Sequence, residues 1–372
     1  MSFNTNTPGL PDMPSVPPVS GEQGFRRDRR IATPSAPAPS PYLPPPANGV
    51  DIAAATEIIN RVSASYERKL VGQTSLKTSL LVSLIAGGHV LLESLPGLAK
   101  TTASQSLAES VQATFKRIQC TPDLLPSDII GTQIYDAVNQ TFKTQLGPVH
   151  ANFVLLDEIN RSSAKTQSAM LEAMQEKQTS IGGEIFPLPK PFMVIATQNP
   201  IEQEGTYELP EAQLDRFLLK EIVGYPTLEE ELEVLKRIDT GALDADSHLS
   251  SVVSLDEVVW LQKEAAKVKI DESIYKYIIN IVSSTRHIGE ILGSDFAPLV
   301  RCGASPRASI AFMKAARALA LMSGRDYVVP DDIKTLRHPI LRHRIILSYE
   351  AELKNETSET IIDRLFNEVP AP

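Results

Sequence analysis

Apolar and polar positions follow two different patterns along the chain. Short runs that are mostly apolar predict buried parallel strands, because such a strand needs apolar side chains on both faces. Elsewhere apolar residues recur every three or four positions, which predicts amphipathic helices. Predicted strands cover 90–92, 115–119, 153–161, 192–196 and 218–223. Predicted helices cover 52–70, 75–86, 100–110, 162–176, 209–217, 228–238, 255–268, 274–285, 306–321 and 331–347.

Strands and helices alternate as far as residue 225, and only helices are predicted after it. This order predicts an α/β fold, a P-loop NTPase αβα sandwich with a parallel five-stranded sheet, over residues 50–225. A small all-helical domain is expected over 226–372. Two hairpins are predicted within the first domain, near 134–142 and around the Gly182-Gly183 pair.

The first 49 residues differ in composition from the rest. They hold 12 of the 28 prolines, with many Ser, Ala and Thr. Such a segment buries too little apolar surface to offset chain entropy, so a disordered tail is predicted. Arg26, Arg27, Arg29 and Arg30 within it are interpreted as a solvated charge run or a docking site. A second loose segment, 240–251, is predicted as a linker.

A candidate phosphate-binding loop follows the first predicted strand. Pro96 and Gly97 end the strand, and Lys100 and Thr101 open a helix. In a strand–loop–helix of this kind, backbone N–H groups face an anion, the Lys reaches the outer phosphates and the Thr ligates Mg²⁺. The predicted nucleotide-binding residues of the loop are Ser94, Leu95, Pro96, Gly97, Leu98, Ala99, Lys100, Thr101 and Thr102.

Two positions of this loop depart from the P-loop pattern, which has Gly where Ser94 and Ala99 stand. Ala99 is expected at the start of the helix, where a Cβ is tolerated. Ser94 is expected to be the more harmful departure, through bulk or strain near the phosphates. Gly97 is retained where the loop needs permissive dihedral angles.

Two adjacent acids follow the apolar run of the third predicted strand. Asp157 and Glu158 follow four apolar residues and lie about 57 residues after Lys100. The carboxyl end of a buried parallel strand faces the ligand crevice. Asp157 is therefore predicted to hold Mg²⁺ through water, and Glu158 to polarise the water that attacks the γ-phosphate.

Three further polar residues are candidates on weaker patterns. Asn199 ends the fourth strand, where it either holds the attacking water or forms a turn before Pro200. Arg216 follows Asp215 directly, and this pattern by itself predicts an ion pair on the surface. Arg307 lies in the first turn of a helix, where its charge opposes the helix dipole, so it either has an anionic partner or is a simple surface arginine.

The composition of the chain restricts the kinds of partner and the cellular location that are expected for the protein. The chain is 42% hydrophobic and 22% charged, with a net charge of −9. The acidic balance argues against a nucleic-acid surface. No apolar run is long enough to span a bilayer, so no membrane insertion and a cytoplasmic location are expected. Cys120 and Cys302 are predicted to be buried thiols of a reducing compartment.

These motifs together resemble the MoxR family of AAA+ ATPases, in the helix-two-insert group. The resemblance rests on Gly-Gly-His-Val-Leu-Leu-Glu at 87–93, Leu-Leu-Asp-Glu-Ile-Asn-Arg at 155–161 and the run at 165–176. The run from Ala196 to Phe217 is the most specific, and Gly-Ala-Ser-Pro-Arg-Ala at 303–308 completes the set. The resemblance covers roughly residues 52–350.

The resemblance implies ATP and Mg²⁺ as cofactors, a helical lid and a hexameric ring. By motif match, Asn199 would be the first sensor, Arg307 the second sensor and Arg216 the arginine finger reaching a neighbour's nucleotide. Gly72 and Gln73 would contact the adenine. The two hairpins would line the centre of the ring. Relatives act as chaperone-like remodelling machines on protein clients, often with partners that carry von Willebrand A-type domains.

Three other functions stay open at this point. A nucleotide-gated scaffold with weak hydrolysis is suggested by Ser94. A small-molecule kinase would share the P-loop but would need an acceptor pocket, for which no motif is visible. A DNA-acting motor would share the hairpin inserts, although the net charge argues against it.

Overall fold

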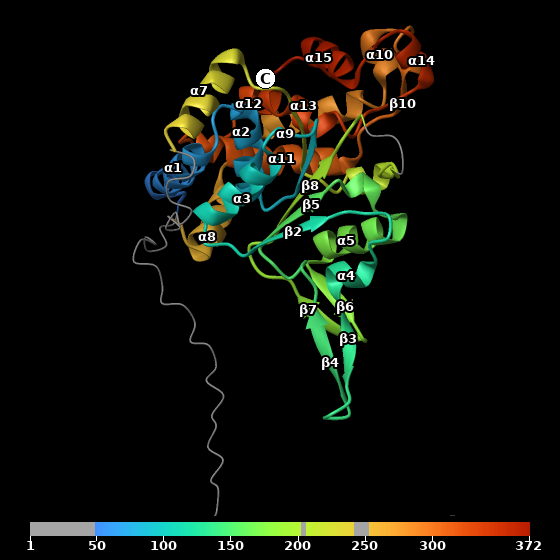
Figure 1. The fold of residues 1–372 in the computed structure, drawn as a ribbon. Coiled ribbons are helices and arrows are strands. Elements are labelled where there is room, and N and C mark those ends of the chain that lie inside the picture. The colour runs from blue at the N-terminus through green and yellow to red at the C-terminus, as the bar shows by residue number, and fades with distance from the viewer. Residues whose placement is uncertain (1–48, 202–205, 242–252) are drawn as a thin grey trace, which may run out of the picture. The chain divides into compact units, whose positions relative to one another are not determined.

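The described residues of the computed structural model are 49–201, 206–241 and 253–372. Most of the predicted tail and of the predicted linker lies outside these ranges. The sheet has five parallel strands in the order β2-β5-β8-β1-β9 (Figure 1). They are β1 (Val90–Ser94), β2 (Phe115–Gln119), β5 (Phe153–Asp157), β8 (Met193–Gln198) and β9 (Leu219–Val223). All five predicted strands are present, but β5 ends at Asp157, and residues Ile159–Arg161, predicted as part of this strand, form a 3-10 helix.

The sheet separates two apolar clusters, because neighbouring side chains of a strand point to opposite faces. In β5, Phe153 and Leu155 belong to one cluster, while Val154 and Leu156 belong to the other. The first cluster is covered by α1 (Ile52–Lys69), α2 (Thr74–Ala86) and α3 (Lys100–Ser110). The second is covered by α4 (Pro126–Ile130) and α5 (Ala164–Glu176).

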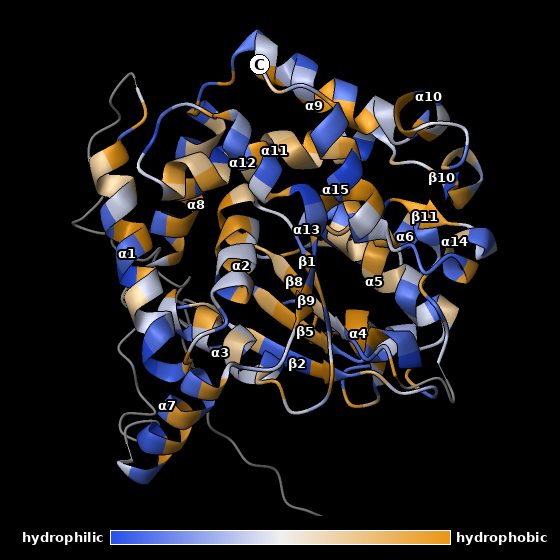
Figure 2. Ribbon diagram, turned by 90° about the horizontal axis from the view of Figure 1, so that it is seen from above, coloured by the Kyte–Doolittle hydropathy of each residue, from blue (hydrophilic) through white to orange (hydrophobic). Residues whose placement is uncertain are grey.

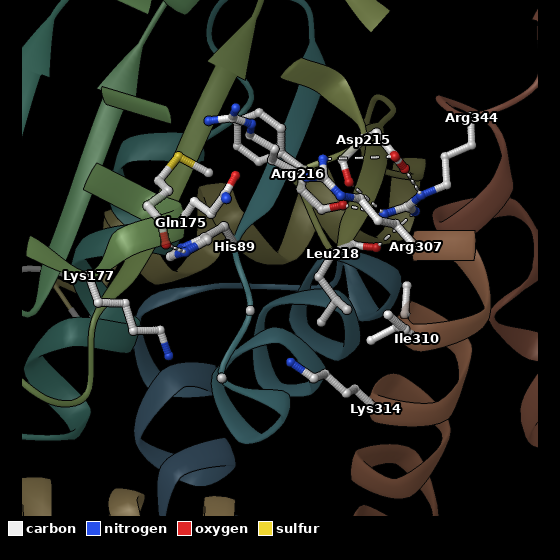
Figure 3. A pocket seen from close by; sticks show the side chains of 15 residues that line it. His89, Gln175, Lys177, Asp215, Arg216, Leu218, Arg307, Ile310, Lys314 and Arg344 are labelled. Atoms are coloured by element: carbon white, nitrogen blue, oxygen red, sulfur yellow. Dashed lines mark hydrogen bonds and ion pairs between the residues drawn. The ribbon is translucent and has the colours of Figure 1, made fainter. Parts of the chain in front are cut away.

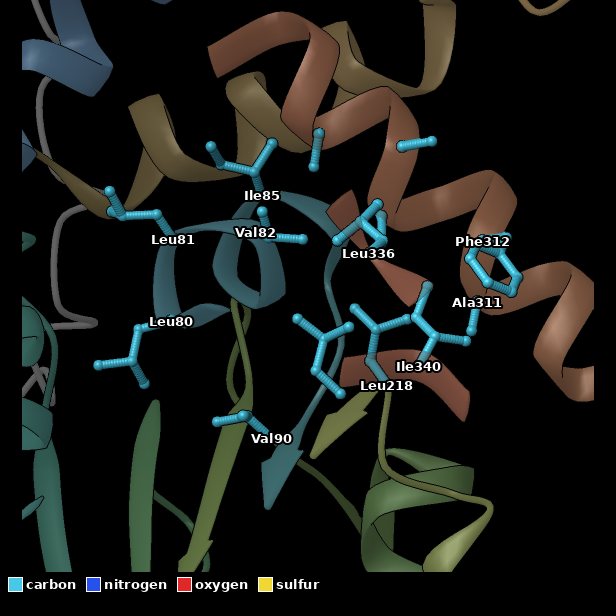
Figure 4. Packing of buried hydrophobic residues seen from close by; sticks show 14 of the residues in the cluster. Leu80, Leu81, Val82, Ile85, Val90, Leu218, Ala311, Phe312, Leu336 and Ile340 are labelled. Carbon is cyan, nitrogen blue, oxygen red and sulfur yellow. The ribbon is translucent and has the colours of Figure 1, made fainter. Parts of the chain in front are cut away.

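The C-terminal helices share the first cluster with the sheet domain. Helix α2 packs against α8 (Leu255–Lys267) and α11 (Pro306–Met322). Val82 and Ile85 of α2 belong to the same cluster of buried side chains as Phe312 of α11 and Leu336 (Figure 4). All four are buried, so the lid helices are held to the nucleotide-binding domain by a continuous apolar core.

Both predicted hairpins are present as two-stranded antiparallel ribbons (Figure 1). One pairs β3 (Gly131–Asp136) with β4 (Thr141–Leu146), and the other pairs β6 (Gln178–Ile181) with β7 (Glu184–Pro187). Strands β3 and β6 are in contact, so the ribbons lie side by side. At the turn of the second ribbon, Gly182 and Gly183 both have positive φ, as a tight Gly-Gly turn requires.

Helix 331–347 was predicted as one element, and the structure breaks it. It forms α12 (Pro330–Thr335) and α13 (Arg337–Leu341), followed by β11 (Ile346–Leu347). Pro339 has no N–H to donate to the carbonyl of Thr335, so one continuous helix cannot form across this point. Strand β11 pairs with β10 (Val300–Cys302), which adds one short ribbon to an otherwise helical lid.

Other helices complete the described part of the chain. Three further helices were predicted and are observed with small differences at their ends, and three had not been predicted. The three predicted helices are α6 (Glu211–Leu214), α7 (Leu228–Asp239) and α9 (Glu272–Ser284). The three helices that had not been predicted are α10 (Ile288–Leu292), α14 (Tyr349–Leu353) and α15 (Ser358–Glu368).

The two cysteines differ in exposure, so the expectation that both are buried is wrong for one of them. Cys120 is buried, whereas Cys302 on β10 is exposed, and both are free thiols. Burial raises the pKa of Cys120 to about 12. Cys302 lies at the end of the short lid strand β10, next to Arg301, which is also exposed.

Candidate functional site

The P-loop joins β1 to α3 as predicted. Gly97 has φ of +82°, which an L side chain rarely adopts, so the glycine is required there. Lys100 begins α3, and its Nζ donates to the Ser94 carbonyl oxygen at 3.3 Å, back across the loop. Burial lowers the pKa of Lys100, while the nearby Asp157 and Glu158 carboxylates oppose that shift. The lysine and both acids therefore share one site.

Of the two departures from the P-loop pattern, it is Ala99 and not Ser94 that has a strained backbone conformation. Ala99 caps α3 in the left-handed conformation, with φ of 53° and ψ of 23°. An alanine in that region carries a steric cost that glycine avoids. Ser94 instead lies in strand β1, paired with Val223, and its hydroxyl donates to the Leu95 carbonyl at 3.0 Å. Ala99 is thus the strained position and Ser94 the ordinary one.

A cavity of about 440 Å³ adjoins the loop. The P-loop residues 96–99 form one wall and residues 69–71, together with Gln73, form another. Tyr225 and two residues of α7, Glu231 and Val234, line the remaining side. We call this space the P-loop cavity.

Gly72 and Gln73 are held at the P-loop cavity by α7. Both have positive φ, and a Cβ on Gly72 would fall 2.0 Å from Glu230 Oε1. The same Glu230 oxygen accepts a hydrogen bond from the Gln73 backbone N–H at 3.2 Å. The side-chain oxygen of Gln73 is buried and has no hydrogen-bond partner. An acceptor of this kind fits the exocyclic amine of an adenine.

The two predicted acids lie at the carboxyl end of β5, beside the end of β8. Asp157 Oδ1 accepts a hydrogen bond of 2.7 Å from the Thr197 hydroxyl, and that hydroxyl accepts one of 2.9 Å from the Glu158 N–H. Glu158 has φ of 57°, in the left-handed region, so the backbone leaves the extended conformation of the strand at this residue. Thr197 is fully buried and had not been identified from the sequence.

Strand β2 contributes two more residues that sequence reasoning missed. Arg117 donates to Asp157 Oδ2 through Nη2 at 2.6 Å and through Nε at 3.1 Å. Gln119 donates to Glu158 Oε2 at 3.0 Å. Strands β2 and β5 pair with Gln119 opposite Asp157, so the cross-strand register brings all four side chains together.

Asn199 follows β8 immediately. Its Oδ1 accepts a hydrogen bond of 3.2 Å from the Ile201 N–H, so the side chain forms the turn that had been one of its two expected roles. The amide nitrogen of Asn199 is left available for another partner.

Arg216 and Arg307 line a second pocket, of about 260 Å³ (Figure 3). It lies between the end of α5, the segment after α6 and the first turns of α11, and it shares no lining residue with the P-loop cavity. Ser305 caps α11 and Pro306 follows it at the first helical position, as predicted. We call this space the arginine pocket.

One carboxylate, Asp215, organises the arginine pocket. It accepts hydrogen bonds from Arg344 Nε at 2.8 Å and from the Ser305 hydroxyl at 2.7 Å. Arg307 Nη1 lies 4.0 Å from it, in a weaker ion pair. Arg344 is buried, and this ion pair opposes the lowering of its pKa by burial. The ion pair between Asp215 and the buried Arg344 therefore holds the wall of the pocket in place.

Arg216 forms an ion pair with neither of the two nearby acids, Asp215 and Glu211. Asp215 pairs with Arg344 and Arg307, and Glu211 pairs with Arg301. Within the described ranges, no ion pair is found for Arg216, and its buried Nε has no hydrogen-bond partner. A cation in this state is suited to an anionic partner.

Comparisons with known proteins agree with this geometry. Residues 89–219 match the model of the ATPase family associated with various cellular activities, and residues 294–365 match the AAA lid domain. The chain is 46% identical to Chaperone MoxR1 of Mycobacterium tuberculosis, over 91% of this chain and 89% of that protein. The chain belongs to the MoxR family of AAA+ ATPases.

Other relatives support the same assignment. Protein MoxR of Paracoccus denitrificans is 31% identical, over 83% of this chain and 95% of that protein. A solved structure of a candidate ATPase from Cytophaga hutchinsonii is 45% identical, with a TM-score of 0.81, and covers 86% of this chain and 97% of its own. The family and this neighbour identify the present MoxR protein as an ATPase, with an α/β P-loop domain followed by a lid.

No helix among residues 49–201, 206–241 and 253–372 is long and apolar enough to cross a bilayer.

Proposed function

We propose that this MoxR protein hydrolyses ATP to remodel protein clients, and that it does so as a ring of identical copies. One observation carries the proposal. Arg216 and Arg307 line a pocket separate from the P-loop cavity of their own chain. They would therefore serve the nucleotide of a neighbouring copy, as an arginine finger does.

The chain's own residues fit ATP and Mg²⁺. Gln73 would accept from the adenine amine, and Lys100 would bind the outer phosphates. Thr101 and Asp157 would hold Mg²⁺, which takes one or two protein oxygens besides phosphate and water ligands. The bound metal supplies positive charge that offsets charge developing on the phosphates.

Glu158 is the proposed base for the attacking water. Gln119 holds its carboxylate in place at 3.0 Å, and Thr197 fixes its backbone. Asn199 would orient the same water through its amide nitrogen, since its oxygen is engaged by Ile201.

The ribbons support contact with a protein client. Tyr135 and Phe142 pair edge-to-face across β3 and β4, with centroids 5.3 Å apart, and both are exposed. Exposed aromatic pairs of this kind mark interaction surfaces. The client, a hexameric ring size, a von Willebrand A-type partner and a cytoplasmic location stay predictions from the sequence, as does the lid boundary at residue 226.

The direct test compares two variants. Glu158→Gln should bind ATP normally but lose turnover, because the phosphate and metal groups remain while the base is removed. Lys100→Ala should weaken ATP binding itself in a calorimetric titration. Wild-type turnover by Glu158→Gln, or unchanged affinity of Lys100→Ala, would contradict the proposal.

A scaffold with weak hydrolysis is the second candidate, and two observations favour it. Arg117 donates a hydrogen bond to Asp157, the proposed metal ligand, and Ala99 in the phosphate-binding loop has a strained left-handed conformation. Each of these features would slow ATP turnover. Turnover below the rate of nucleotide exchange in the wild type would support the scaffold. Adding DNA to the same assay tests the motor alternative, which requires stimulation by DNA.

A further inference from the structure

Arg117 lies on β2, the edge strand of the sheet. Strand β2 is largely hydrophilic, whereas the neighbouring β5 is apolar as far as Asp157 (Figure 2). In the register of the two strands, Arg117 lies opposite Leu155, two residues before Asp157. A long side chain reaches such a diagonal neighbour on the same face of a sheet. The edge strand thus brings a guanidinium to the proposed metal ligand.

Three hydrogen bonds reach the Asp157 carboxylate. Arg117 donates two of them to Oδ2, from Nε at 3.1 Å and from Nη2 at 2.6 Å, and the Thr197 hydroxyl donates the third to Oδ1 at 2.7 Å. An ionised carboxylate offers about four lone-pair positions, two on each oxygen. Arg117 therefore fills both positions of Oδ2, and at most one position of Oδ1 is left for a metal ion or a metal-bound water.

Arg117 approaches Asp157 from the solvent side. The side chain of Arg117 is 50% exposed, whereas that of Asp157 is only 11% exposed. Lys100, another cation of the site, donates instead to the Ser94 carbonyl oxygen. A carboxylate that is nearly buried needs a positive partner, and Arg117 supplies it. A divalent cation at the same carboxylate would supply that charge itself and would repel the guanidinium.

We propose that Arg117 competes with Mg²⁺ for Asp157. The guanidinium leaves Oδ2 when the metal binds, and it returns to balance the carboxylate charge when the metal dissociates. Release is easy because half of the Arg117 side chain is already exposed, and Nη2 also donates to Gln119 Oε1 at 3.0 Å. Arg117 therefore limits how tightly the site holds its metal. The inference rests on the proposed role of Asp157 as a metal ligand.

The sign of a change in metal affinity tests the competition. Residues that orient a metal ligand strengthen metal binding, and removing them weakens it about 10–100-fold. Competition predicts the opposite sign. In the full chain without nucleotide, Arg117→Met should bind Mn²⁺ about tenfold more tightly than wild type in a titration followed by electron paramagnetic resonance, because the charge and both donors are lost. Lys116→Met, at the next position of β2 but on the opposite face, is the matched control for the lost charge and should change the affinity less than about twofold.

Two further variants identify the metal ligand and cover the case in which Arg117→Met does not fold. Arg117→Met/Asp157→Asn should lose the gained Mn²⁺ affinity, and a gain that survives there would overturn the inference. Arg117→Lys keeps a positive charge beside Asp157 but lacks the bidentate fork, so its Mn²⁺ affinity should rise by a smaller factor. Unchanged or weaker Mn²⁺ binding by the Arg117 variants would overturn the inference and leave the proposed function standing. Wild-type Mn²⁺ affinity in Asp157→Asn alone would instead contradict the metal role of Asp157 in the proposed function.

Discussion

Thr197 Oγ1 lies 2.7 Å from Asp157 Oδ1 and joins the carboxyl ends of two neighbouring parallel strands. The same hydroxyl accepts a hydrogen bond from the Glu158 N–H. One buried side chain thus fixes both the proposed metal ligand and the proposed base. Residues that orient a ligand in this way commonly affect activity nearly as much as the ligand itself.

Replacing Thr197 with Val should reduce both stability and turnover. The change keeps the shape of the side chain but leaves the Glu158 N–H and an Asp157 oxygen without their partner, at a cost of about 1–3 kcal/mol in the free energy of unfolding. Turnover should fall about 10–100-fold. Urea unfolding and a phosphate-release assay measure the two effects. Thr78→Val removes an exposed hydroxyl that bonds within α2 and should change neither.

Ala99→Gly should stabilise the protein. Relief of the left-handed alanine is worth about 1–2 kcal/mol, and the greater freedom of glycine in the unfolded chain offsets about 0.4–1 kcal/mol of it. Ser94→Gly should act in the opposite direction, because it removes a buried hydroxyl that is hydrogen-bonded and relieves no positive φ. Thermal unfolding of the two variants side by side decides between them. A stabilised Ser94→Gly with an unchanged Ala99→Gly would restore the ranking expected from the sequence.

His89 should make stability depend on pH. Burial lowers its pKa to about 4, and its Nδ1 accepts a hydrogen bond of 3.0 Å from the Val194 N–H. The unfolded chain, with a histidine pKa near 6.5, binds more protons than the folded protein between these values. Stability should therefore be lost as pH falls from about 6.5 to about 4, by up to about 3 kcal/mol.

The His89→Asn variant isolates this contribution. Asparagine offers an acceptor to Val194 but does not titrate, so the free energy of unfolding should fall less steeply with acid than in wild type. His343 is also buried with a lowered pKa and remains in both proteins, which cancels its contribution in the comparison. Equal slopes for the two proteins would show that His89 is not held neutral by the fold.

The strands and the main site residues could be predicted because they follow from local pattern. The β5 run from Phe153 to Leu156 is fully apolar since both faces of the strand are covered, and the acids come directly after it. The break at Pro339 was also visible in the sequence, because proline removes a helical hydrogen bond. That signal was not applied to the helix predicted over 331–347.

Other features depend on contacts that sequence pattern does not contain. Arg117 and Gln119 reach the acids only through the register of β2 on β5. A signal was available for Gln119, since a polar residue ending a strand beside β5 lies at the same edge of the sheet. Tertiary packing determines the positive φ of Ala99. It also determines that Arg216 forms no ion pair with Asp215. The residue pattern of the sequence indicates neither feature.

The most direct test of the account is the ATP turnover of mixed subunits. Glu158→Gln subunits keep Arg216, and Arg216→Ala subunits keep Glu158, so each alone should be nearly inactive. In randomly mixed rings, roughly a quarter of the interfaces would join an intact base to an intact arginine from the neighbour. The account predicts that turnover partly returns on mixing. Arg216→Ala rings that assemble and hydrolyse ATP like wild type, or mixtures no more active than their separate components, would contradict it.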